Sequence, residues 1–79
     1  MTYTPPSITI EELLIECGKY TFFKELVVDV DTKDVAIIFN TKLDIKLYRV
    51  IPSIWLENSN WGIIIDNLQV LMKESLKYD

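Results

Sequence analysis

The stretch that decides the fold is FFKELVVDVDTKDVAIIFN, residues 22–40, in which three aspartates separate two apolar runs. In both runs apolar residues recur with a period of two, which is typical of β-strands. The runs can be paired so that their apolar residues share one face; the predicted pairs are Val30–Val35, Val28–Ile37 and Leu26–Phe39. This pairing leaves residues 31–34 as a four-residue loop, a length commonly built on a type I turn with aspartate first. The sequence therefore predicts a β-hairpin.

The spacing of Asp29, Asp31 and Asp34 also resembles the start of a calcium-binding loop. An EF-hand needs a ligand at its fifth position, glycine at its sixth and glutamate at its twelfth. The fifth and twelfth positions here are Lys33 and Asn40, the sixth is again an aspartate, and the flanks are strand-like. We therefore predict no metal site and interpret the aspartates as turn residues that present an acidic edge.

Two helices are expected to flank the strands. Thr9 and Glu12 form a capping-box pattern ahead of an apolar stripe that ends at Gly18. After the polar cluster 57–60, Ser59 or Asn60 is a candidate cap for a final helix. Its apolar residues recur at steps of three and four and are Trp61, Ile64, Ile65, Leu68, Leu71, Met72 and Leu76. The β-branched residues 63–65 also fit a short strand, and the sequence leaves both alternatives open.

A third strand is predicted from an alternation that Pro52 ends, because proline cannot donate to a sheet ladder. Its inward residues are Leu43, Ile45, Leu47 and Ile51. Residues 1–8, with Pro5 and Pro6, are expected to be extended, and residues 9–79 to form one domain. The expected fold is α+β, a two-layer sandwich of order α-β-β-β-α. A three-stranded antiparallel meander carries both helices on one face.

The second sheet face then holds more apolar residues than a solvated face normally does: Phe23, Val27, Ile38, Tyr48 and Val50. Apolar patches rimmed by charge often mark an interface. The alternatives are a helix that crosses to cover this face, or ordinary exposed surface. Trp55 lies in the apolar run 54–56, one residue of which must point outward. The candidate partner-binding residues are Phe23, Val27, Asp29, Asp31, Asp34, Ile38, Tyr48, Val50 and Trp55.

Most catalytic sites are excluded by residue inventory. The chain has no histidine and only two glycines, so it has no histidine-based triad, phosphate-cradling loop or dinucleotide fingerprint. Cys17 falls at a helix C-terminus beside Glu16, where a thiolate is disfavoured, and we interpret it as structural. Asp29 and Asp31 are a weak carboxylate pair, because acid–base catalysis needs a water-excluding pocket. We therefore predict a protein that is not an enzyme and takes no cofactor.

Charge and hydropathy narrow the choice of partners. The net charge of −4 falls in residues 1–40, which hold seven acids and three lysines. This disfavours nucleic acid, whose binding uses clustered cations, and favours a basic protein. The strand aromatics lack the basic groove that usually accompanies base stacking. One cysteine forms no intramolecular disulfide, and no apolar run approaches the roughly 18 residues of a membrane span. A cytoplasmic protein without a membrane anchor is expected.

The most specific functional hypothesis is a non-enzymatic, protein-binding module. Eleven isoleucines against one alanine, and seven lysines against one arginine, are typical of AT-rich coding sequences. Small acidic proteins of phages and mobile elements often inhibit basic, nucleic-acid-handling host proteins, which gives one specific form of the hypothesis. The alternative is a self-associating homodimer that uses the second sheet face.

Overall fold

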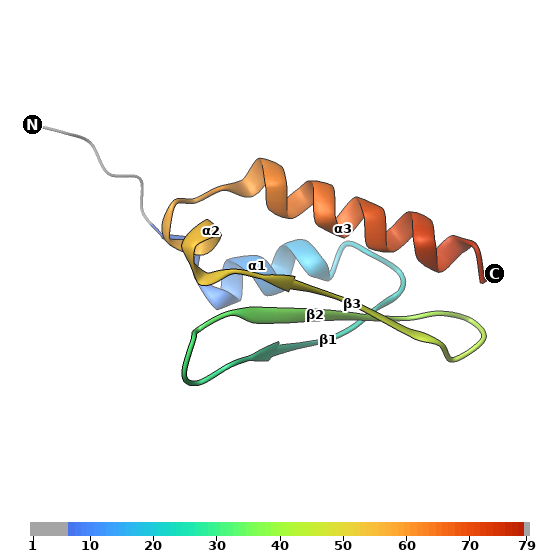
Figure 1. The fold of residues 1–79 in the computed structure, drawn as a ribbon. Helices are drawn as coiled ribbons and strands as arrows, with labels where there is room; N and C mark the ends of the chain where they lie inside the picture. Colours follow the sequence, from blue (N-terminus) through green and yellow to red (C-terminus); the bar gives the residue numbers. More distant parts are fainter. Residues whose placement is uncertain (1–6, 79) are drawn as a thin grey trace, which may run out of the picture.

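The structure, a computed structural model, describes residues 7–78. Its elements are α1 (Ile10–Cys17), β1 (Phe23–Val28), β2 (Val35–Asn40), β3 (Lys46–Ile51), α2 (Ser53–Glu57) and α3 (Trp61–Leu76). The strands form one antiparallel sheet in the order β1-β2-β3, with the helices on one side of it (Figure 1). The predicted α+β fold and meander are confirmed. The short helix α2, from the apolar run 54–56, adds an element to the expected order.

The predicted limits of α1 are confirmed by its hydrogen bonds. The Glu12 N–H donates to Thr9 Oγ1 at 3.1 Å, and the Thr9 N–H donates to Glu12 Oε1 at 3.3 Å, which completes the capping box. The Gly18 N–H donates to the Leu14 carbonyl at 2.9 Å and closes the last turn. The predicted extended segment 1–8 lies outside the described residues up to position 6. Ile8 is buried, and its N–H donates to the Leu56 carbonyl at 2.8 Å.

The core lies between the helices and one face of the sheet. Val35, Ile37 and Phe39 alternate along β2 with less buried residues and are completely buried. The helices contribute Leu13, Cys17, Ile64, Leu68 and Leu71 to the same cluster. α3 runs unbroken through residues 63–65 and packs on β3 and β2, so the short-strand alternative for these residues is wrong.

The predicted register of the first hairpin is wrong by two residues. Val28 pairs with Val35 and Leu26 with Ile37, so residues 29–34 form a six-residue loop. Val30, predicted to point inward from a strand, lies in this loop with 77% of its surface exposed. Because side chains alternate with a period of two, a two-residue shift leaves the remaining residues on their predicted faces.

A second correction concerns Phe23, which does not lie on the outer face of the sheet. The pairing of β1 with β2 shifts between Phe23 and Glu25, which identifies a β-bulge at Lys24. The extra residue turns Phe23 toward the helices. There its ring packs edge-on against Phe39, with 6.4 Å between the centroids.

The third strand also begins later than predicted. Leu43 lies exposed in the β2–β3 turn, and Ile45 precedes the strand. The turn is closed by Thr41, whose N–H donates to the Ile45 carbonyl at 2.9 Å and whose Oγ1 accepts from the Ile45 N–H at 3.0 Å. Residues 43–45, predicted to begin the strand, therefore belong to the turn, and β3 begins at Lys46. The predicted inward position of Leu43 is wrong.

We expect Ile37→Val to lower the free energy of unfolding by about 1 kcal/mol, because it removes one methyl group from a completely buried site. Ile54→Val is the matched control, since Ile54 is half-exposed on α2 and should change stability by only a few tenths of that amount. Urea unfolding followed by circular dichroism measures both. Equal effects of the two substitutions would contradict the one-sided core.

Candidate functional site

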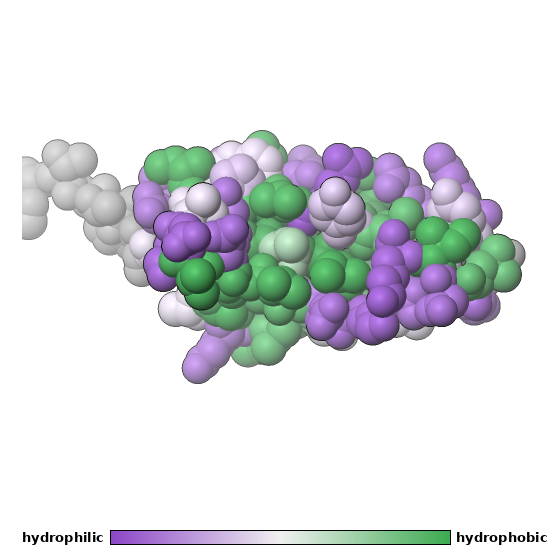
Figure 2. Space-filling model, turned by 60° about the horizontal axis from the view of Figure 1, so that its bottom comes forward, coloured by the Kyte–Doolittle hydropathy of each residue, from purple (hydrophilic) through white to green (hydrophobic). Residues whose placement is uncertain are grey.

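The face of the sheet opposite the helices carries apolar side chains that nothing in the described chain covers. We call it the open face; its residues are Glu25, Val27, Ala36, Ile38, Tyr48 and Val50. The strand register aligns Val27, Ala36 and Val50 in one row across the three strands. Val27 and Val50 are 48% and 49% exposed, and Tyr48 is 67% exposed. Figure 2 shows apolar side chains gathered over the left and middle of this view, bordered by hydrophilic ones, with a further apolar group at the right end.

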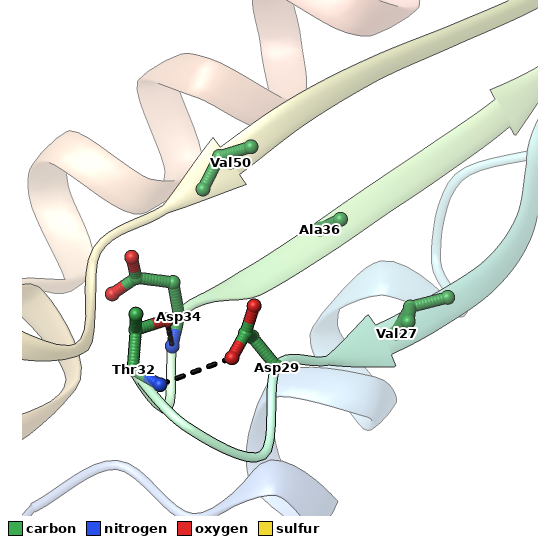
Figure 3. Close-up of a pocket in the computed structure, with 6 residues that line it drawn as sticks. All are labelled: Val27, Asp29, Thr32, Asp34, Ala36 and Val50. Atoms are coloured by element: carbon green, nitrogen blue, oxygen red, sulfur yellow. Dashed lines mark hydrogen bonds between the residues drawn. The ribbon is translucent and has the colours of Figure 1, made fainter.

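One end of the open face meets the β1–β2 loop, residues 29–34, which we call the acidic loop. A hollow of about 330 Å³ lies at this junction, and its lining residues are Val27, Asp29, Thr32, Asp34, Ala36 and Val50. In Figure 3 the three apolar side chains come from three adjacent strands, and the polar ones stand together at the loop end. The hollow therefore has an apolar floor and an acidic rim.

Asp29 holds the acidic loop in shape. Its Oδ1 accepts from the Asp31 N–H at 2.8 Å and from the Thr32 N–H at 3.0 Å, while its carbonyl accepts from the Lys33 N–H at 2.9 Å. Lys33 has a φ of 65°, in the left-handed region that such a tight reversal needs. The hydrogen bonds from Thr32 and then Asp31 hold the pKa of the Asp29 carboxyl below its ordinary value of 3.8.

Asp34 ties the acidic loop to the segment after β3. Its Oδ1 accepts from the Ser53 N–H at 2.8 Å, and so satisfies a donor in the first turn of α2 that has no partner within the helix. The Asp34 N–H in turn donates to Thr32 Oγ1 at 3.2 Å. Asp31 differs from Asp29 and Asp34, because its exposed side chain takes no part in these hydrogen bonds. The rim of the hollow thus has two structural carboxylates, Asp29 and Asp34, whereas the Asp31 side chain is exposed on the acidic loop.

The structure brings together seven of the nine predicted partner-binding residues. The open face holds Val27, Ile38, Tyr48 and Val50, and the acidic loop holds Asp29, Asp31 and Asp34. Phe23 packs toward the core as described, and Trp55 is half-buried against the same core. The outward residue of the apolar run 54–56 is Ile54.

Sequence reasoning missed Ala36 and Thr32. Ala36 alternates with Val35 and Ile37, so its outward position was available from the period of two. Its small side chain lies between Val27 and Val50 at the floor of the hollow. No sequence pattern marked Thr32, because its place in the lining of the hollow depends on where the acidic loop closes.

The thiol of Cys17 and the grouping of possible metal ligands are the other features that bear on chemistry. Cys17 is completely buried, and burial, followed by the charge of Glu16, raises the pKa of its thiol to about 12. This thiol therefore stays protonated and unreactive at neutral pH. Within residues 7–78, no three His, Cys, Asp or Glu side chains are grouped to hold a metal ion. None of the helices in that range has the length and apolar character needed to cross a membrane.

Comparison with protein-family models, with curated proteins and with solved structures found no match. The function is therefore inferred from the open face and the acidic loop themselves.

We expect Asp29→Ala to destabilise the protein at neutral pH, because it removes the acceptor of two loop hydrogen bonds. The folded pKa of Asp29 is lowered, so its contribution to stability is present above pH 3.8 and is lost as the pH falls through the folded value. The difference from the wild type should therefore shrink on acidification. Urea unfolding at neutral and acidic pH measures it.

Asp31→Ala is the control for this prediction, since it removes the same charge from the same loop without removing one of those hydrogen bonds. A loss of stability equal to that of Asp29→Ala would show that charge, and not loop closure, determines the effect.

Proposed function

We propose that the protein is a non-enzymatic, protein-binding module whose open face and acidic loop together bind an apolar and basic surface of a larger partner. The observation that carries the proposal is the exposed row of Val27, Ala36 and Val50, on a sheet whose other face is completely buried at β2. Apolar surface of this kind gains about 25 cal/mol for each Å² removed from water.

The dimensions of the open face support the involvement of the loop. Three strands of six residues give a face of about 14 Å by 20 Å, or roughly 300 Å², against about 800 Å² per partner in a standard interface. The face alone is therefore small for a stable complex. A partner that also contacts the acidic loop gains area, and its charge adds to the rate of association.

The charge of the rim indicates a basic partner. The acidic loop carries three aspartates against Lys33, and the whole chain has a net charge of −4. Phosphate backbones would be repelled, whereas lysine and arginine side chains would be attracted. A basic, nucleic-acid-handling protein fits this chemistry. Inhibition of such a protein in the cytoplasm, by a small protein of a phage or mobile element, is the specific form that we propose.

A catalytic role for the hollow is less well supported. General acids need a pKa near the working pH, whereas the loop hydrogen bonds lower that of Asp29. The Oδ1 atoms of Asp29 and Asp34 already accept hydrogen bonds from the backbone. These carboxylates shape a surface and do not match an acid–base pair.

The proposal is tested by capture of partners from a native-host extract on immobilised wild-type protein and two variants. Val50→Lys places a charge in the open face, and Val70→Lys is the matched control on α3, where Val70 is 39% exposed. We expect a protein retained by the wild type and by Val70→Lys to be lost from Val50→Lys. Its affinity for the purified partner should fall at least tenfold, or by about 1.4 kcal/mol. Equal retention on all three contradicts the proposal.

The contribution of charge is measured with Asp31→Lys, which reverses a charge of the acidic loop without changing a loop hydrogen bond. We expect weaker binding and a smaller loss of affinity with added salt than for the wild type. Unchanged affinity and an unchanged salt dependence would remove the acidic loop from the interface.

A further inference from the structure

The floor of the hollow is narrow and apolar. Val27, Ala36 and Val50 form it, and the strand register places them side by side in one row across the sheet. Ala36 is the middle residue of this row and has the smallest side chain, so the floor is lowest over β2, between the two valines (Figure 3). The hollow is thus open to a thin apolar group that lies along β2.

The acidic rim stands at one end of this floor. The Asp29 N–H donates to the Asp34 carbonyl at 2.9 Å, so the two aspartates continue the pairing of β1 with β2. Asp29 is two residues from Val27, and Asp34 is two residues from Ala36. Side chains two positions apart share a face of a strand, about 7 Å from each other. The hollow therefore changes from apolar to acidic over a short distance along the strands.

Each rim carboxylate has one oxygen held by the backbone. Asp29 Oδ1 accepts two N–H groups of the acidic loop, and Asp34 Oδ1 accepts the N–H of Ser53. Within residues 7–78, neither Oδ2 accepts a backbone N–H, and no lysine or arginine forms an ion pair with either side chain. The rim thus has two negative charges that the described chain does not pair with a cation.

We propose that the hollow takes one lysine side chain of the partner, with the alkyl stem on the floor and the ammonium group at the Oδ2 atoms of Asp29 and Asp34. The inference rests on the proposed function and names the group that the acidic rim recognises. Lysine is apolar along its stem and charged only at its end. The hollow has the complementary order of surfaces, and its volume of about 330 Å³ accommodates one such side chain.

The rim favours lysine over arginine. A guanidinium group binds most strongly when both oxygens of one carboxylate accept its parallel N–H groups. The N–H groups of Asp31 and Thr32 occupy both lone pairs of Asp29 Oδ1, so this carboxylate offers a cation only its Oδ2. An ammonium group directs three separate donors and fits single oxygens of two carboxylates.

Titration of isotope-labelled protein with small amino-acid derivatives, followed by NMR, tests the hollow apart from the rest of the interface. The probe is Nα-acetyl-lysine N-methylamide, and its norleucine counterpart keeps the four-carbon stem but lacks the ammonium group. We expect saturable shifts of the Val27, Thr32 and Ala36 amides by the lysine derivative, with a Kd of roughly 10 mM. The norleucine derivative should bind about threefold more weakly. Absence of saturable shifts with the lysine derivative, or equal binding of both, overturns the proposal.

The arginine derivative is the probe for the choice of cation. It should bind about twofold more weakly than the lysine derivative, because the fork of its guanidinium finds no free pair of oxygens on Asp29. Tighter binding of the arginine derivative would overturn the choice of lysine.

Ala36→Leu fills the floor of the hollow and keeps the open face apolar. We expect it to raise the Kd of the lysine derivative at least fivefold, because the stem loses its place. Ile38→Phe is the matched control, since it adds volume on the same strand and the same face but outside the lining of the hollow. It should leave the Kd unchanged. Equal effects of the two variants would overturn the position of the stem.

Asp29→Asn and Asp34→Asn test the position of the ammonium group. Asparagine keeps an Oδ1 that accepts the loop hydrogen bonds but removes the charge. Each variant should weaken the lysine derivative about threefold and leave the norleucine derivative unchanged. Asp31→Asn is the matched control, because it removes the same charge from the same loop outside the lining. Equal weakening by all three would assign the attraction to the loop as a whole and overturn the contact with the rim.

The two proposals fail separately. If Val50→Lys loses a captured partner and the lysine derivative does not bind the wild type, the open face keeps its function and the lysine site is overturned. If the lysine derivative binds as expected and capture is equal on all three proteins, the lysine site is supported and the proposed partner is overturned.

Discussion

The packing of α1 and α3 against the inner face of β2 is the contact on which the rest of the structure depends. Val35, Ile37 and Phe39 are completely buried there, and both neighbouring strands take their register from β2. A helix is about 10 Å across, so two helices suffice to cover one face of a sheet about 14 Å wide. Within residues 7–78 there is no further long helix to cover the other face. The open face is thus exposed because both long helices are used to cover the inner face of the sheet.

The acidic loop links this architecture to the surface. Asp29 closes the loop through two backbone donors, and Asp34 reaches Ser53 at the start of α2, 19 positions further along the chain. Their carboxylates therefore fix the shape of the rim of the hollow. A preformed rim loses little conformational entropy on binding, which favours affinity in a small protein.

The sequence predicted those features that depend on periodicity and capping. The capping box at Thr9, the buried alternation in β2 and the helical stripe of α3 all follow from spacing. The errors lie where local hydrogen bonds compete with hydrophobic pairing. Pairing Val30 with Val35 buries one more valine, yet the Asp29 side chain closes a larger loop and leaves Val30 exposed. Periodicity contains no information on that competition.

The residues of the candidate site could be predicted for the same reason. The prediction was wrong where the strand is irregular. Val27, Ile38, Tyr48 and Val50 lie on the open face because their strands are regular there. Phe23 lies toward the core because of one extra residue at Lys24, since a bulge exchanges the face of the strand residue before it. No residue type at positions 23–25 marks the bulge in advance.

The bulge at Lys24 also changes the composition of both the core and the open face. By turning Phe23 inward against Phe39 it adds an aromatic side chain to the core and removes one from the open face. It also leaves only residues 25–28 of β1 paired with β2 in a continuous register.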